Sequence, residues 1–286
     1  MALGHHFRVA PGTKVKLRDI DPDHHGKHAD KEAANAEMER DIARMAELQA
    51  LLYAENRRSL LICLQGLDAS GKDGTIVHVF QGLNPQGVEV AQFKNPTREE
   101  LAHDFLWRIH RQAPERGRVM IFNRSQYEDV LVVRVHELVP KDVWSSRYDH
   151  INEFEKNLVD EGTSILKFYL HISEDEQLRR FEKRLDDPLR QWKISESDYE
   201  ERKFWPRYID AFEDVFHKTS TSHAPWYIIP ANHKWFRNFA VASIVVETME
   251  SLGLKTPRPS VNLEEIRKKY HAAVKEGHKA ARHAGV

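Results

Sequence analysis

The chain of 286 residues is poor in cysteine: Cys63 is its single thiol, so it cannot form an internal disulfide bond. Chains of this kind are typical of a reducing compartment, and we expect a cytoplasmic protein. No apolar run approaches the length of about 18 residues that a membrane span requires, and residues 1–20 lack the apolar core of a signal peptide. We therefore expect neither a membrane nor a secreted protein.

A surplus of charge of one sign is also missing. The 43 Lys and Arg residues balance 44 Asp and Glu residues, which gives a net charge of −1. A surface devoted to nucleic acid would be strongly basic, so we expect no nucleic-acid partner. No zinc-binding spacing is present, and no pair of histidines suggests catalysis. His24, His25 and His28 leave open a metal site near the N-terminus, although an exposed flexible arm is the favoured interpretation.

The order of apolar runs predicts the fold class. Residues 1–29 show no periodicity and are predicted to be a loop or a draped arm, whereas residues 30–56 repeat apolar side chains at the helical period. Predicted strands then follow at 59–65, 88–93, 118–122, 164–172 and 226–229, and predicted helices at 72–81, 97–112, 128–138, 144–161 and 234–252. Strands that alternate with helices predict an α/β protein in three layers, with a parallel sheet covered by helices on both faces and ligands beyond the carboxyl ends of the strands.

One stretch interrupts this alternation. Residues 174–218 form about 45 residues of charged, aromatic and mostly helical sequence between the fourth and fifth strands, far more than a crossover needs. We interpret this stretch as a helical insertion that forms a lid, and the domain that carries it is expected to cover residues 30–255. The remaining residues, 256–286, are predicted to be a polar helix or tail.

A glycine-rich motif, GLDASGK at 66–72, follows the first strand and opens the next helix. This context makes the spacing G-x-x-x-x-G-K typical of a phosphate-binding loop, in which backbone N–H groups surround phosphate oxygens. Lys72 is expected to supply a positive charge to the outer phosphates. The residues expected to contact phosphate around it are Gly66, Ala69, Ser70, Gly71, Asp73, Gly74 and Thr75.

Two residues depart from the usual form of this loop. Asp73 replaces the Ser or Thr that commonly ligates Mg²⁺ after the lysine, although Thr75 is near. Asp68 places a carboxylate inside the loop, where it would repel an anionic substrate unless a cation intervened. We therefore expect Asp68 to bind Mg²⁺ or to orient an attacking group, and a simple turn-forming role stays as the alternative.

A second motif, FNRSQYED at 122–129, follows the third strand. An Asp that binds magnesium often ends this strand in phosphate-loop enzymes, but Asn123 stands here, so Glu128 or Asp129 would have to substitute for it. Arg124 is expected to face the phosphates, because its planar fork of donors suits oxyanions. Arg134 on the following helix either reaches the site or lies on the surface.

Basic residues recur in the predicted lid and after the fifth strand. Within the lid, Arg179, Arg180, Lys183 and Arg184 would share one helical face, and Arg190 and Lys193 follow them. Such a face suits closure over a polyanion, although a solvated helix is the alternative. Lys234 and Arg237 come just after the fifth strand, either for contact with substrate or as ordinary residues of a helix start.

Four motifs in order give the chain a clear family resemblance. They are GLDASGKDGT at 66–75, FNRSQYEDVLVVR at 122–134, RRFEKRLDDPLRQWKIS at 179–195 and APWYIIPANHKWFRN at 224–238. Together they resemble the bacterial polyphosphate kinase 2 family over about residues 30–255. The Asn-Arg-Ser form of the second motif is similar to the class III branch, which phosphorylates both AMP and ADP from polyphosphate.

The resemblance implies a thymidylate-kinase-like P-loop fold and a reversible, Mg²⁺-dependent transfer of a terminal phosphoryl group between inorganic polyphosphate and AMP, ADP or ATP, with Mn²⁺ as a substitute ion. It implies catalytic roles for Asp68, Lys72 and Arg124, and nucleotide contacts from Asn123, Glu128 and Arg134. Metal binding is expected from Asp68 and Asp129, phosphate binding from Arg179, Lys183, Arg184, Arg190, Lys193, Lys234 and Arg237. It also suggests a homodimer or homotetramer. An ATP-dependent nucleotide or nucleoside kinase and a non-catalytic polyphosphate-binding protein remain the alternatives.

Overall fold

A five-stranded parallel sheet forms the centre of the computed structural model, which describes residues 3–26 and 31–283. The strands lie in the order β2-β3-β1-β4-β5, and every neighbouring pair is parallel. Their bounds are β1 (Ser59–Gln65), β2 (Val88–Gln92), β3 (Val119–Asn123), β4 (Thr163–His171) and β5 (Trp226–Pro230). The sheet belongs to a compact unit, Met1–Leu254, and Lys255–Val286 form a second unit.

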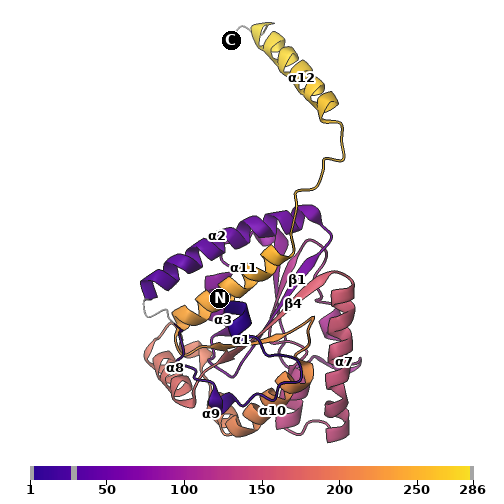
Figure 1. Ribbon diagram of the computed structural model, residues 1–286. Coiled ribbons are helices and arrows are strands. Elements are labelled where there is room, and N and C mark those ends of the chain that lie inside the picture. The colour runs from indigo at the N-terminus through magenta and orange to yellow at the C-terminus, as the bar shows by residue number, and fades with distance from the viewer. Residues whose placement is uncertain (1–2, 27–30, 284–286) are drawn as a thin grey trace. The chain divides into compact units, whose positions relative to one another are not determined.

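The central strand shows why the sheet is covered on both faces. Every residue of β1 is buried, as expected for a parallel strand with helices on either side. Leu60, Ile62 and Leu64 join one hydrophobic cluster, and Leu61 and Cys63 join another, because successive side chains point to opposite faces. Figure 1 shows α2 (Lys31–Glu55) beside α11 (Lys234–Ser251) over one face and α7 (Lys141–Asp160) across the other. The three-layer α/β prediction is confirmed.

The helix predicted at 97–112 is wrong, because the structure has two single-turn helices there. Thr97 caps α4 (Arg98–Leu101) through a capping box with Glu100. The Asp104 side chain then accepts the N–H of Leu106 at 3.0 Å, which forms a turn in place of a continuous helix. The chain re-enters a helix only at α5 (Trp107–His110).

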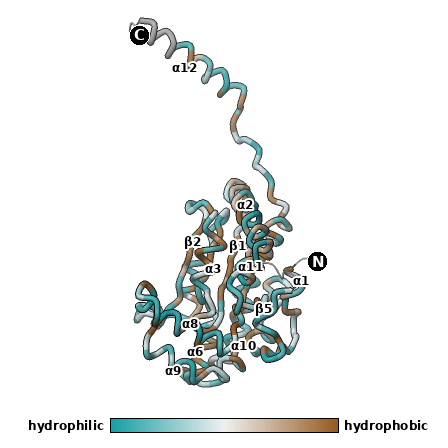
Figure 2. Tube along the Cα trace, turned by 90° about the vertical axis from the view of Figure 1, so that its left-hand side faces the viewer, coloured by the Kyte–Doolittle hydropathy of each residue, from teal (hydrophilic) through white to brown (hydrophobic). Residues whose placement is uncertain are grey.

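The lid sequence folds into helices between β4 and β5. They are α8 (Glu174–Asp186), the 3-10 turn η3 (Gln191–Lys193), α9 (Glu196–Arg202) and α10 (Trp205–Thr219). Figure 2 shows α8 as a largely hydrophilic segment. Its neighbour α10 buries Phe212, Val215 and Phe216 in the core and so attaches the lid to the sheet layer. The other short elements of the compact unit are η1 (Leu17–Asp19), η2 (Pro85–Gly87), α3 (Lys72–Val79) and α6 (Glu128–Val135).

The N-terminal segment packs on the compact unit along residues 3–26, which corrects the expectation of an exposed flexible arm. It opens with α1 (Leu3–Phe7), whose first N–H groups donate to the Glu247 carboxylate at 3.0 and 3.2 Å. Farther along, the Val9 N–H donates to the Trp226 carbonyl at 2.8 Å. The segment is therefore tied to both α11 and β5.

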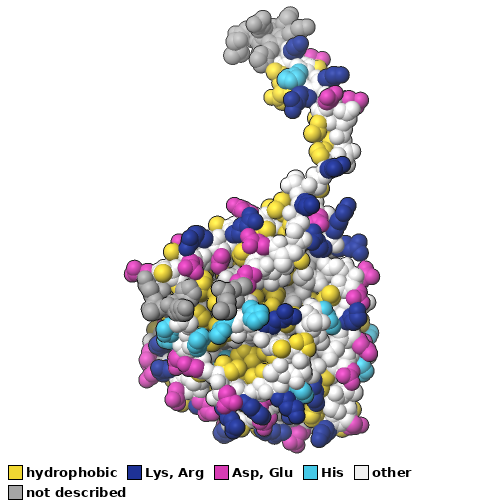
Figure 3. Space-filling view, in the orientation of Figure 1, with side chains coloured by type: hydrophobic (Ala, Val, Ile, Leu, Met, Phe, Trp, Pro, Cys, Tyr) yellow, Lys and Arg dark blue, Asp and Glu magenta, His cyan; other side chains and the backbone are white. Residues whose placement is uncertain are grey.

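The histidines of this segment stack on aromatic rings. The His24 ring lies 5.4 Å from that of His6, and His25 packs against His233 and Trp235; Figure 3 shows histidine side chains gathered on this face. His28 lies outside the described residues. Among those that are described, no three His, Cys, Asp or Glu side chains come together as a metal site.

The second unit contains α12 (Leu263–His283), which fits the predicted helix or tail. Its side chains from 261 to 276 are exposed. Across the described part of the chain, no helix combines the length and the apolar character that crossing a bilayer demands.

Candidate active site

The glycine-rich loop leaves the carboxyl end of β1 with backbone angles that few residues adopt. Gly66, Ala69 and Gly71 have φ values of 152°, 61° and 103°. A Cβ at Gly66 would lie 2.6 Å from the Ser70 Oγ and 2.9 Å from the Leu170 carbonyl, so glycine is required there for space as well. The loop ends directly at the first residue of α3, Lys72. Its final turn therefore presents the N-terminal amides of a helix, which suit phosphate oxygens.

The Lys72 side chain folds back into the loop. Its Nζ donates to the Gly66 carbonyl at 2.7 Å, and the residue is 8% exposed. Burial, together with the nearby Arg124 guanidinium, lowers the pKa of Lys72 to about 8. A bound phosphate would replace the carbonyl partner and favour the charged form of this lysine.

An ion-paired chain links this loop to the end of β3. Arg124 donates to the Asp68 carboxylate at 2.9 Å and to the Glu128 carboxylate at 2.9 Å. Its φ of 64° turns the side chain out of the strand direction. The Glu128 carboxylate is the main cause that raises the pKa of Arg124. From the lid, the Gln177 amide donates to the Asp68 carbonyl at 2.9 Å. The structure thus brings together Asp68, Lys72 and Arg124, the three residues predicted to be catalytic, because Asp68 pairs with Arg124 and both influence the pKa of Lys72.

Asp73, the residue that follows the lysine, connects the lid to the same edge of the sheet. The Asn123 amide donates to its Oδ1 at 2.8 Å, and the Lys193 ammonium lies 3.8 Å from its Oδ2. An Asp at position 123 would repel this carboxylate, whereas Asn123 can donate to it. Thr75 does not face the loop opening, because its hydroxyl donates to the Gly71 carbonyl at 3.2 Å.

Two arginines lie behind the loop. Arg237, expected to contact phosphate, is 2% exposed and donates to the Ser70 carbonyl at 3.3 Å. Burial lowers the pKa of Arg237 to about 9, helped by the neighbouring Arg180. Arg180 is also buried and donates to the carbonyls of Ala69 and Ser70 at 2.8 and 2.9 Å. The expected single basic face of α8 is therefore divided, since Arg180 points inward.

A basic hollow of about 370 Å³ lies beside these arginines. Arg179, Lys183 and Lys234 line it, with Glu176 and Asp23 as the acidic members. The pKa of Lys234 is lowered by burial and by the surrounding arginines and Lys183. An anion bound in the hollow would reduce this repulsion between cations.

The other predicted lid cations have partners elsewhere. Arg184 donates to the Lys193 carbonyl at 3.1 Å, and the Arg190 guanidinium lies 2.9 Å from the Asp187 carboxylate.

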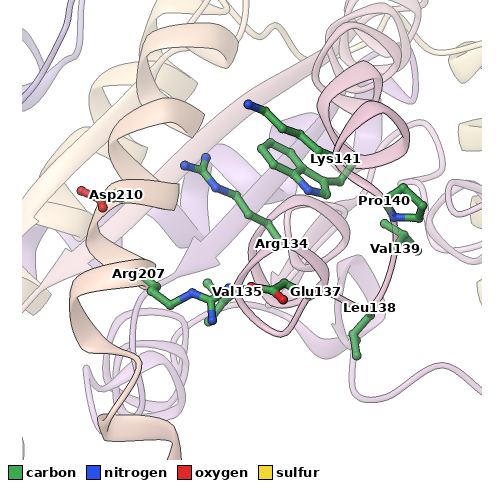
Figure 4. Close-up of a pocket in the computed structure, with 10 residues that line it drawn as sticks. Arg134, Val135, Glu137, Leu138, Val139, Pro140, Lys141, Arg207 and Asp210 are labelled. Carbon is green, nitrogen blue, oxygen red and sulfur yellow. Dashed lines mark hydrogen bonds and ion pairs between the residues drawn. The ribbon is translucent and has the colours of Figure 1, made fainter.

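A larger hollow of about 660 Å³ lies between α6, α7 and α10. Arg134, Lys141 and Arg207 contribute cations to it, and Trp144 contributes an aromatic face; Figure 4 shows the three cationic side chains around the hollow. The Arg134 guanidinium lies 4.8 Å from the centre of the Trp144 ring and donates to the Asp214 carboxylate at 2.7 Å. Arg134 therefore lines a cavity and is not a residue of an open surface.

Asp129, predicted to bind metal, is enclosed by two other cations. Its carboxylate lies 3.1 Å from the Arg108 guanidinium and 3.6 Å from that of Arg147. Burial raises the pKa of Asp129, because it penalises the charged form. An incoming metal ion would have to displace two guanidinium groups, so this placement does not favour Asp129 as a ligand.

Asp68 suits a divalent ion better than Asp129, because its carboxylate pairs with one guanidinium, that of Arg124, and not with two. Its side chain is 31% exposed beside the loop, and its hard carboxylate oxygens suit Mg²⁺. Mg²⁺ commonly takes one or two carboxylates and completes its shell with water and substrate phosphates. Among the described residues no group of three His, Cys, Asp or Glu side chains comes together at this site.

Several residues of the site were not predicted. Gln177, Arg207 and Trp144 were not singled out, because none belongs to a charged or glycine-rich motif. The only signal for Arg180 was its place in the run of basic residues, and its inward orientation depends on the packing of α8 against the loop.

A parallel sheet with a phosphate loop after its central strand and a helical lid beyond β4 defines a P-loop phosphotransferase. Residues 28–257 match the family model described as Polyphosphate kinase 2. The chain is 52% identical over 265 residues to the AMP/ADP-polyphosphate phosphotransferase of Meiothermus ruber, covering 91% of this chain and 98% of that protein. The protein therefore belongs to the polyphosphate kinase 2 family and is an enzyme of that family, as the four motifs indicated.

Two further comparisons agree. The ADP-polyphosphate phosphotransferase of Rhodopseudomonas palustris is 45% identical, with 88% of this chain and 91% of that protein covered. The crystal structure of polyphosphate kinase 2 from Arthrobacter aurescens TC1 is 41% identical and has a TM-score of 0.91, covering 95% of this chain and 97% of that one. The P-loop kinase fold predicted from the sequence is thereby confirmed.

Proposed function

We propose that this enzyme transfers the terminal phosphoryl group of inorganic polyphosphate to AMP and to ADP, forming ADP and ATP, and that the reaction is reversible and requires Mg²⁺, with Mn²⁺ as a substitute. Family membership and the name of the Meiothermus ruber relative, which includes both AMP and ADP, support this choice. The alternative with ADP as the sole acceptor corresponds to the name of the Rhodopseudomonas palustris relative.

One observation carries the proposal: two hollows of different chemistry lie among the segments that follow the strands on either side of β1, the strand that leads into the phosphate loop. The basic hollow is lined by residues of α8 and of the segment after β5, whereas the hollow with Trp144 is lined by the segment after β3 and by α10. Because β1 lies between β3 and β4 in the sheet, these segments approach the loop from opposite sides. A polyanion suits the basic hollow, and a nucleotide suits the hollow that combines cations with an aromatic ring.

The distance between the hollow and the reacting groups also fits a nucleotide. Glu128, which pairs with Arg124, begins α6, and Arg134 lies six residues farther along the same helix. A rise of 1.5 Å per residue separates them by about 9 Å along the axis. The base would lie near Trp144, and the acceptor phosphate would extend toward Arg124.

The residues of the loop would then act by position and charge. The transition state of phosphoryl transfer is loose, so charge neutralisation by Lys72 and Arg124 carries much of the catalysis. An acceptor phosphate is already largely ionised at neutral pH, because its second pKa is about 6, and no strong general base is needed. Asp68 holds Arg124 and would hold Mg²⁺, which supplies a Lewis acid to the phosphate oxygens when bound.

The direct test mixes the purified protein with AMP, Mg²⁺ and polyphosphate in the absence of ATP, and follows nucleotides by chromatography. ADP followed by ATP is the expected result. ADP alone would restrict the acceptor to AMP, and conversion only when ATP is the donor would contradict the proposal and indicate an ordinary nucleotide kinase. Binding of polyphosphate without turnover would indicate a non-catalytic polyphosphate-binding protein.

The nucleotide hollow has its own test. Replacing Arg134 with Met should raise KM for AMP and ADP by about tenfold, the usual cost of losing one charge-assisted contact, while KM for polyphosphate stays unchanged. The matched control is Arg116→Met, which removes an exposed guanidinium 3.4 Å from Glu161. Equal effects on both substrates would argue against separate hollows. A homodimer or homotetramer is part of the same proposal, and light scattering of the purified enzyme tests it.

A further inference from the structure

Two arginines from different elements converge on the back of the phosphate loop. Arg180 comes from α8 of the lid, and Arg237 comes from α11, which follows β5. Both donate to the Ser70 carbonyl, at 2.9 and 3.3 Å, and Arg180 also donates to the Ala69 carbonyl at 2.8 Å. The lid and the sheet layer therefore meet at one peptide group of the loop.

Burial makes this arrangement costly. The two residues are 6% and 2% exposed, and two buried guanidinium groups repel each other. Arg180 has a carboxylate partner, Glu176, at 2.7 Å. Arg237 instead donates to the side-chain carbonyl of Asn238, at 3.1 and 2.8 Å. Burial and Arg180 accordingly lower the pKa of Arg237 to about 9. A fold that needed only filled space here could use an apolar side chain of similar volume at lower cost.

The geometry of a trans peptide shows what the contacts achieve. The C=O and N–H groups of one peptide plane point in opposite directions. Holding the Ser70 carbonyl at the back of the loop therefore turns the Gly71 N–H toward the opposite side, where phosphate oxygens would lie. The Ala69 carbonyl is fixed in the same way, and the N–H of its peptide, that of Ser70, donates to the Leu67 carbonyl at 3.0 Å.

Two glycines are explained by the same guanidinium. A Cβ at Gly71 would collide with Arg237, which adds a steric reason to its φ of 103°. Gly74 has no such backbone requirement and lies in the first turn of α3, although glycine is a poorer helix former than Ala. A Cβ at Gly74 would lie 3.3 Å from the Arg237 Nη2, closer than most side chains tolerate. The loop sequence thus leaves room for Arg237 at two positions.

We propose that Arg180 and Arg237 are positioning residues that lock the Ser70–Gly71 peptide with its N–H toward the phosphate chain, and that Gly74 is glycine to admit Arg237. Neither arginine touches the substrate; both act through the loop backbone. The proposal deepens the proposed function and rests on it only in that the loop binds phosphates.

Steady-state kinetics of Arg237 variants test the proposal. Arg237→Gln retains N–H donors but removes the positive charge, whereas Arg237→Lys retains the positive charge on a single ammonium group. We expect Arg237→Gln to lower kcat/KM for polyphosphate by up to about 100-fold, because a small misplacement of reacting groups has a cost of this size. Arg237→Lys should be about tenfold better than Arg237→Gln. KM for ADP should stay within twofold. Affinity for tripolyphosphate, measured by calorimetry, should fall in parallel with kcat/KM.

The matched control is Arg58, which also donates to a backbone carbonyl, that of Leu252, and pairs with Glu55. It precedes β1 and so lies at the opposite end of that strand from the loop. Arg58→Gln and Arg58→Lys should change thermal stability but neither kcat nor either KM. If the Arg237 variants behave like those of Arg58, with stability reduced and kinetics within twofold of wild type, the positioning role is refuted.

A double-mutant cycle gives a readout that a loss of stability alone would not move. Gly74→Ala should lower kcat/KM in the wild-type background, because the new Cβ displaces the guanidinium. In an Arg237→Met background the same change should have less than a twofold effect, which corresponds to a coupling of about fivefold or more. Equal effects of Gly74→Ala in both backgrounds would refute the steric link.

The wild-type enzyme in the same assay separates this proposal from the proposed function. If wild type turns over only with ATP, the polyphosphate assignment fails, and the variants are compared with ATP as donor. If it turns over with neither donor, the affinities of wild type, Arg237→Gln and Arg58→Gln for tripolyphosphate decide whether the arginines position the loop.

Discussion

Replacing Asp68 with Asn removes a carboxylate from the centre of the site and leaves its neighbours in place. Arg124 keeps its second partner, Glu128, at 2.9 Å, so its position should persist. The Asp68 and Arg124 side chains are 31% and 37% exposed. A pair this accessible to solvent contributes about 0–1 kcal/mol to stability, and we expect the variant to unfold at nearly the wild-type denaturant concentration.

The effect on catalysis should be much larger. A group that acts on transition-state charge in a protected site is worth about 2.7–4 kcal/mol, or about 10²–10³ in kcat. We therefore expect Asp68→Asn to lower kcat by at least 10² and to raise the Mg²⁺ concentration needed for half-maximal rate. The assay is ATP formation from ADP and polyphosphate across a magnesium titration.

A matched control makes this prediction sharp. Asp160→Asn breaks a similarly close pair, because the Lys156 ammonium lies 2.7 Å from its carboxylate, but it does so on the exposed end of α7. Its kcat should equal that of wild type. A rate for Asp68→Asn within threefold of the control variant would refute the assigned role of the carboxylate.

Three further predictions concern charge. The pKa of Lys72, about 8, lies below the usual value of 10.5, so the free enzyme is expected to lose this cation as pH rises through 8. The ratio kcat/KM reports the free enzyme and should therefore fall in this range. A flat profile to about pH 9 would contradict the role of the charged Lys72 in binding phosphate. Glu155→Gln removes the carboxylate that pairs with the fully buried Lys167 at 2.6 Å. The free energy of unfolding, measured in urea, should fall by about 3–5 kcal/mol and should be partly restored by adding Lys167→Met. An unchanged unfolding midpoint would exclude this explanation. Replacing Lys183 and Lys234 with Gln should flatten the rise of KM for polyphosphate with salt, because screened cations are lost; an unchanged slope would place the polyanion elsewhere.

The parts of the site that the sequence predicted are those with local causes. The loop at 66–72 is determined by its own glycines, by the strand before it and by the helix after it. The placement of Asp68 and Arg124 in one site followed from a topological rule, because both residues lie just beyond the carboxyl ends of parallel strands, here the adjacent β1 and β3; the ion pair between them was not predicted. No knowledge of side-chain packing was needed for either.

The parts that sequence analysis missed depend on packing between distant elements. Basic composition could not show that Arg237 is buried behind the loop while Lys234 lines a hollow, since positions only three apart in α11 lie in opposite environments. Asp129 was a candidate ligand because Asn123 stands where a metal-binding Asp often ends this strand, yet Arg108 from α5 reaches the Asp129 carboxylate. The N-terminal segment lacked periodicity because β5, α10 and α11 dictate its course.

The near-zero net charge conceals a polarity across the site. On the side of α8 and α11, Lys183, Lys234 and Arg237 form no ion pair with a carboxylate of the described residues, and the pKa of Lys234 and that of Arg237 are lowered. On the side of β3, Glu128 neutralises Arg124 and raises its pKa. Under the proposed function, an approaching polyphosphate would be attracted to the first side, where it would relieve repulsion between cations. The second side offers carboxylates that repel free phosphate and suit a metal-bound nucleotide. Such an arrangement would direct donor and acceptor to opposite sides of one loop without a surface that is basic as a whole.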